Sequence, residues 1–99
     1  MKALFVVCRS TLEAEVRDCL RSVHVAALTE IGQVSGIGAA GTAPSAWEPP
    51  NVLIFVVLSG EQVAEVTHSL GDLVARLKPS YEGHAVPLRV FGMPCESLV

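Results

Sequence analysis

A glycine-rich segment near the middle of the chain has the composition of an anion-binding turn. It reads Val34-Ser35-Gly36-Ile37-Gly38-Ala39-Ala40-Gly41 and follows a predicted strand. Glycines let backbone N–H groups approach an anion closely, and successive N–H groups can form a nest for phosphate. A dinucleotide fingerprint would instead follow the first strand and open a helix, which this segment does not. A plain linker between two halves of the chain is the alternative interpretation.

The cysteines and histidines suggest a second chemistry, because thiolate and imidazole ligands suit Cu(I) or Zn(II). Cys19 falls on the apolar stripe of a predicted helix, which indicates a core residue. His24 is predicted at a helix C-terminus, His68 on a helix surface and His84 in a turn. No two of these residues have metal-ligand spacing, so we predict no metal ligands and keep a metal-binding protein as the rival function.

No residue pattern typical of a catalytic site is present. Ser59 precedes a glycine but has the position of a helix N-cap, and Glu13 and Glu15 fall on a solvated helix face. No Ser/His/Asp or Cys/His set can be assembled from sequence proximity. We therefore expect a protein that is not an enzyme and requires no cofactor.

Composition limits the class of protein further. The 99 residues fit one domain, spanning 1–99, and 51% are apolar while 17% are charged. A net charge of −3 disfavours nucleic-acid binding. The longest apolar run, 52–58, has the length of a strand, so we expect no membrane insertion. An odd number of cysteines, three, favours reduced thiols and a cytoplasmic location.

The elements that would position these residues are predicted from a repeat and from hydrophobic periodicity. Phe-Val-Val recurs at 5–7 and 55–57, and Ala-Glu-Val recurs at 14–16 and 64–66. A strand–helix unit written twice, each copy followed by a further strand, predicts the ferredoxin-like order β-α-β-β-α-β. We predict strands at 3–7, 27–34, 51–58 and 86–91, and helices that start near Thr11 and Gly60. Ser10 with Glu13, and Ser59 with Gln62, have capping-box spacing.

Two helices can cover only one face of such a sheet, because right-handed crossovers place both on the same side. The strands at 3–7 and 51–58 are nevertheless apolar on both faces. An exposed apolar surface of that size rarely stays in water. We therefore expect a homo-oligomer that stacks the uncovered faces, and the patterning alone does not fix the number of subunits.

The stretch from Val16 to Gly41, "VRDCL" on a helix followed by "ALTEIGQVSGIG", resembles the PII signalling proteins and their PII-like relatives. Those proteins have "EVKDAL" and then "LTVSEVKGFG" at nearly the same spacing. The resemblance covers the whole chain in element order. It implies a homotrimer of ferredoxin-like subunits with an adenine nucleotide between neighbours. It also implies a T-loop, here about 39–50, that engages a target protein such as a transporter or an enzyme.

Carried over by position, the resemblance implies two sets of ligand-binding residues. Thr29, Ser35, Gly36, Ile37 and Gly38 would line the cleft from one subunit. The turn Glu82-Gly83-His84-Ala85, with Gly83 and His84 as its ligand-binding members, would take the place of the family's "GDGK" B-loop.

Departures from the family's pattern bear on the ligand. The B-loop lysine is replaced by Ala85, and the family's Arg and Gln after the glycine motif are Ala39 and Ala40. These changes predict either compensation by Arg89, Lys78 and Arg9 or a ligand that carries less charge than ATP, such as AMP or another small anion. The short loop 41–50 also lacks the tyrosine that some family members have uridylylated.

Trp47 is predicted to bind a partner protein from the proline-rich loop, with packing over its own sheet as the alternative. The rival function is a trimeric metal-tolerance protein of the CutA kind. A structural oligomer without any ligand is the third possibility.

Overall fold

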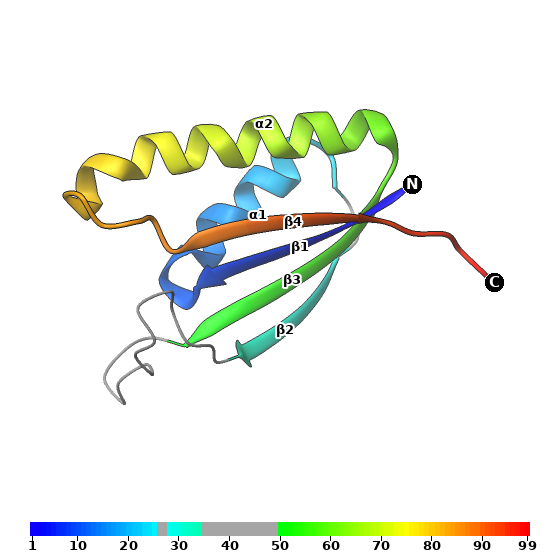
Figure 1. Ribbon diagram of the computed structural model, residues 1–99, viewed down its shortest axis with the longest axis horizontal. Helices are drawn as coiled ribbons and strands as arrows, with labels where there is room; N and C mark the ends of the chain where they lie inside the picture. The colour runs from blue at the N-terminus through cyan, green and yellow to red at the C-terminus, as the bar shows by residue number, and fades with distance from the viewer. Residues whose placement is uncertain (26–27, 35–49) are drawn as a thin grey trace.

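The computed structural model describes residues 1–25, 28–34 and 50–99, and these residues form a β-sheet with helices over one face (Figure 1). The strands of the described residues are β1 (Lys2–Arg9), β2 (Thr29–Val34), β3 (Asn51–Leu58) and β4 (Leu88–Pro94). The helices are α1 (Glu13–Ser22) and α2 (Gly60–Leu77). The 3-10 turn η1 (Ser10–Leu12) precedes α1, and η2 (Lys78–Tyr81) follows α2.

The strands are antiparallel in the order β2-β3-β1-β4, which confirms the predicted ferredoxin-like fold. β1 lies at the centre between β3 and β4, so Phe5 pairs with Phe55 on one side and with Phe91 on the other. The last strand begins later than predicted, at Leu88 rather than Val86. Pro87 has no N–H to donate, and the Leu88 N–H bonds to the Val86 carbonyl at 2.8 Å, which bends the chain before pairing starts.

The core lies between the sheet and the two helices. Val6, Ile54, Val16 and Val66 are completely buried and represent one strand and one helix from each half of the repeat. Cys19 is buried in the same cluster, which confirms that it is a core residue. Alternate strand residues therefore face the helices, as expected when side chains point to opposite faces with a period of two.

One of the two predicted capping boxes is confirmed. The Ser59 hydroxyl accepts from the Gln62 N–H at 3.4 Å, and the Gln62 side chain accepts from the Ser59 N–H at 3.2 Å. The prediction for Ser10 and Glu13 was wrong, because Ser10 enters η1 and no side chain caps either η1 or α1. Glu13 instead pairs with Arg17 one helical turn later, at 3.3 Å.

The second strand is irregular around Gly32. Its register against β3 shifts between Ile31 and Val34. The shift changes the direction of β2 just before the glycine-rich segment begins, as a bulge does.

The face of the sheet opposite the helices is apolar and uncovered, as predicted. Phe91 is 58% exposed, Ile31 51%, Met93 51% and Val57 44%. Phe5 and Phe55 lie beside them, with ring centroids 5.1 Å apart. We call the surface formed by these six residues the open face. In Figure 1 both helices lie on the other side of the strands.

Replacing Gly71 with alanine is expected to stabilise the protein by about 1 kcal/mol, because glycine is a poor residue for the middle of a helix. A Cβ at this position in α2 would meet no atom within 4 Å. The midpoint of urea unfolding is the measurement, and it should rise. Gly92→Ala is the control, since its Cβ would lie 3.0 Å from the Cδ2 of buried Leu4 and should bring no gain. An unchanged or lower midpoint for Gly71→Ala would contradict the prediction.

Candidate functional site

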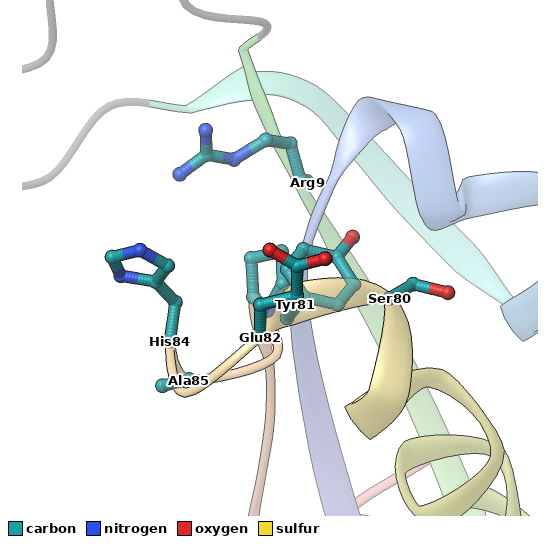
Figure 2. A pocket seen from close by; sticks show the side chains of 7 residues that line it. Arg9, Ser80, Tyr81, Glu82, His84 and Ala85 are labelled. Atoms are coloured by element: carbon teal, nitrogen blue, oxygen red, sulfur yellow. The ribbon is translucent and has the colours of Figure 1, made fainter.

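A surface depression of about 370 Å³ lies where β1 ends and the chain turns from η2 towards β4 (Figure 2). The residues that line it come from the end of β1, from η2 and from the turn that follows: Arg9, Ser80, Tyr81, Glu82, His84, Ala85 and Pro87. This depression combines two basic side chains, two hydroxyl groups and one carboxylate. We call it the turn pocket.

The turn is held in shape by its backbone. Glu82 and Gly83 both have left-handed conformations, with φ of 41° and 86°. Glycine at position 83 adopts that conformation without the steric cost that other residues bear. The His84 N–H then donates to the Tyr81 carbonyl at 2.8 Å, closing the turn. Tyr81 is half-buried against the core, so the turn is attached to the body of the protein.

Arg9 supplies the wall of the pocket that belongs to the sheet. Its backbone N–H donates to the Pro87 carbonyl at 3.0 Å, which fixes the end of β1 against the turn. Its side-chain Nε is buried and has no hydrogen-bond partner in the part of the chain that the structure describes. A buried donor without a partner costs free energy, so this nitrogen is suited to an acceptor from outside.

The charges around the pocket favour an anion. Figure 2 shows the Arg9 guanidinium and the His84 imidazole extending to the same side of the turn. Arg89 pairs with Val7, two residues before Arg9, and alternation along the strands places both arginines on the same face of the sheet. Glu82 is the carboxylate that opposes them. Guanidinium groups bind phosphate and carboxylate through charge-assisted hydrogen bonds.

The pocket lies next to the ends of the glycine-rich loop. Asn51 pairs with Arg9 on one side and with Val34 on the other, so the three residues form one row across the sheet. The Ser10 N–H also donates to the Pro50 carbonyl at 2.8 Å. The chain therefore leaves the sheet after Val34 and returns at Pro50, close to the pocket.

The predicted ligand-binding residues are found in different places. His84 lines the turn pocket and Gly83 belongs to the same turn, while Arg89 is exposed on the same face as Arg9. Thr29 begins β2 and lines a separate hollow of about 230 Å³ with Leu28, Phe55, Val56 and Val57. Within one subunit the turn pocket does not include Thr29. Ser35, Gly36, Ile37, Gly38 and Trp47, and most of the predicted loop at 39–50, lie outside the described residues. All of these assignments stay predictions.

Sequence reasoning missed the contribution of η2. After α2 the chain continues through Pro79 as a 3-10 turn that brings Ser80 and Tyr81 to the pocket. Proline at the start of a helical turn was the available signal, because its fixed φ favours that position.

A second polar cluster ties α1 to β2. Arg17 forms an ion pair with Glu30, whose strand lies at the edge of the sheet, and another with Glu13. The pKa of the Cys8 thiol rises to about 11, first because the group is buried and then because Glu13 and Glu30 repel a thiolate. Cys8 is therefore a neutral, unreactive thiol at neutral pH.

No group of three or more His, Cys, Asp or Glu side chains that could hold a metal ion occurs among the described residues. None of the helices in residues 1–25, 28–34 and 50–99 is long and apolar enough to cross a membrane. The metal-tolerance interpretation has no specific observation in its favour here.

Cys8 is expected to resist alkylation in the folded protein, while the more accessible Cys95 reacts. Iodoacetamide at pH 8, followed by peptide mass spectrometry, measures both sites.

Because the pKa of Cys8 is raised from 9.0 to about 11, the neutral thiol favours the folded state, and this contribution to stability is lost as pH rises from 9 through 11.

The loss of stability between pH 9 and 11 should therefore be smaller in Cys8→Ala than in the wild type. Cys19→Ala serves as the control for the loss of a buried thiol from the core. Rapid alkylation of Cys8 in the folded protein at pH 8 would contradict both the burial and the raised pKa of this thiol.

Comparison with known proteins gives a family match and solved structures of similar fold. The model of the family described as "Nitrogen regulatory protein P-II" matches residues 1–95. A structure of CPII from Thiomonas intermedia K12 bound to ADP and bicarbonate is similar, with a TM-score of 0.63, 19% identity, and 93% of this chain and 84% of that chain covered. No curated protein sequence matches significantly.

Two further structures of CPII from the same organism are similar as well. One, a nitrogen regulatory PII-like protein bound to ADP, AMP and bicarbonate, gives a TM-score of 0.65 at 19% identity, with 93% of this chain and 84% of that chain covered. The other, bound to ADP, AMP and acetate, gives 0.63 at 18% identity, with 97% and 88% covered. At these identities the likeness is one of fold.

Proposed function

The chain belongs to the nitrogen regulatory protein P-II family, and we propose that it is a non-enzymatic regulator that binds a small anionic effector between its subunits. The proposed effector is an adenine nucleotide. Its binding would shift the 41–50 loop between two states, and the loop with Trp47 would bind or release a partner protein such as a transporter or an enzyme. We place this activity in the cytoplasm, as the odd number of cysteines favours.

The observation that carries this proposal is the turn pocket. Arg9 presents a buried nitrogen that has no partner among the described residues, and His84 extends to the same side from the turn that would take the place of the family's B-loop. Both groups suit the oxygens of a phosphoryl group. The CPII structures, which share this fold, are described as bound to ADP and AMP, and this supports an adenine nucleotide as the ligand.

The charge of the pocket favours a small effector over ATP. Its lining contains Arg9 and His84 as basic groups and Glu82 as an opposing carboxylate, with Arg89 nearby on β4. Each further phosphate of a nucleotide adds negative charge that these few groups must balance. We therefore propose that AMP or ADP binds more tightly than ATP.

The subunit interface is the second part of the proposal. The open face exposes large apolar side chains on β2, β3 and β4, among them Ile31, Val57 and Phe91. Burying apolar surface contributes about 25 cal/mol per Å², so pairing such faces favours association. In a trimer, Thr29 of one subunit would lie in the cleft beside a neighbour, which is how a residue remote from the turn pocket could still contact the ligand.

Light scattering is expected to report three times the chain mass of 10.5 kDa. Phe91→Glu, which places a charge on the open face, should dissociate the assembly because a buried unpaired carboxylate is costly. Thr67→Glu, which adds the same charge to the exposed surface of α2, is the matched control and should leave the assembly intact. A wild-type protein that is monomeric at micromolar concentration would remove the intersubunit site.

Calorimetry with ATP, ADP, AMP and cyclic AMP tests the effector. We expect AMP or ADP to bind most tightly, and Arg9→Gln to weaken that binding at least about tenfold, because a hydrogen bond to a charged group contributes about 1.5–3 kcal/mol. Arg76→Gln, on the exposed surface of α2, should bind like the wild type. No heat with any of the four nucleotides at millimolar concentration would end the nucleotide proposal.

Trp47 is the one tryptophan of the chain, so its fluorescence in the same titration follows the loop directly. A change in emission that saturates with the calorimetric binding is the expected result. Gly36→Val should weaken the binding, because a side chain at this glycine would obstruct the close approach of the backbone to an anion. Binding without any change at Trp47 would separate effector binding from the proposed response of the loop.

A further inference from the structure

The titratable groups around the turn pocket come from four segments. Arg9 is at the end of β1, Arg89 is in β4, Tyr81 ends η2, and Glu82 and His84 belong to the turn. The two arginines are positive and Glu82 is negative at every pH near neutrality. Among the lining residues, histidine is the side chain that changes its charge between pH 5 and 8.

The imidazole of His84 is exposed and has no hydrogen-bond partner among the described residues, although its backbone is fixed by the bond to Tyr81. His68 offers a contrast within the same chain. Its Nε2 lies 3.3 Å from the carboxylate of Asp72 on the exposed surface of α2, and His68 does not line the pocket. His84 is therefore the histidine whose charge can respond to a ligand in the turn pocket.

An anion beside an imidazole favours the protonated form, because opposite charges at short range lower the free energy of the ion pair. Thermodynamic linkage makes the effect reciprocal, so a proton on His84 must strengthen the binding of the anion by the same factor. Arg9 keeps its charge throughout and would hold the anion at any pH. His84 would add the part of the affinity that depends on pH.

We propose that the turn pocket binds the oxyanion of its effector together with a proton on His84, so that this regulator responds to pH as well as to effector concentration. The inference rests on the proposed function, because it concerns the same pocket. The ligand class is an oxyanion of the phosphoryl type, either the phosphate of a nucleotide or free inorganic phosphate. Affinity is highest where His84 is protonated and falls as pH rises towards 8.

The test compares the wild type with His84→Lys, which is positive at both pH values, and with His84→Gln, which is neutral at both. The dissociation constants for AMP, ADP and inorganic phosphate are measured by calorimetry at pH 6 and pH 8. The phosphate's own ionisation affects all three proteins equally, so it cancels when their pH ratios are compared. His68→Gln is the matched control, since it removes a histidine outside the pocket.

The ratio of the dissociation constants at pH 8 and pH 6 is expected to be about tenfold larger for the wild type than for either His84 variant. His68→Gln should keep the wild-type ratio. Titration of the wild type in two buffers that differ in ionisation enthalpy should also show proton uptake on binding, and His84→Lys should lack that part of it.

The outcomes separate this inference from the proposed function. Binding with the same pH ratio in the wild type and His84→Lys would overturn the inference and leave effector binding intact. Absence of binding for AMP, ADP and phosphate at both pH values would overturn the proposed function and the inference with it. If AMP or ADP gives the expected ratio of dissociation constants and inorganic phosphate does not bind, the oxyanion belongs to a nucleotide. If inorganic phosphate gives the same ratio, the oxyanion is the free ion.

Discussion

Both helices cover the same face of the sheet because each joins two parallel strands through a right-handed crossover, with a third strand between them. One face thus becomes the core, where Val6, Ile54 and Val66 are fully buried. The other keeps Phe91 and Ile31 in contact with solvent in the isolated chain. The oligomer proposed for this protein, and the clefts between its subunits, follow from this single constraint.

The turn pocket depends on the same core although it lies at the end of the sheet. Tyr81 packs against the buried cluster and accepts the bond that closes the turn, while the Arg9 N–H joins β1 to Pro87. The groups proposed to bind the anion are therefore attached to the central strand and to the end of the longer helix. A site on rigid elements keeps its geometry when the neighbouring loop changes state.

The sequence predicted those parts of the fold that have a local pattern. The strand at 51–58 and the Ser59 capping box were predicted correctly because apolar runs and N-cap spacing depend on neighbouring residues. The predicted capping box at Ser10 does not form because Glu13 pairs with Arg17. Arg17 also pairs with Glu30, thirteen residues further along the chain. Long-range pairs of this kind leave no periodic signal.

The candidate site was predictable only in part for the same reason. His84 and its turn were found through the family resemblance, whereas the buried Nε of Arg9 depends on how the end of β1 meets Pro87. Thr29 and the turn pocket lie apart in one chain. A cleft made by two subunits cannot be derived from the pattern of one, since its walls come from separate copies.

The row formed by Val34, Asn51 and Arg9 has a consequence for how such regulators diversify. The two points where the chain leaves and rejoins the sheet are fixed as cross-strand neighbours, whatever number of residues connects them. Closing a longer connection costs only about 0.6 kcal/mol for each doubling of its length. Segments of different length and composition can therefore be exchanged between these points while the sheet and the turn pocket are inherited intact.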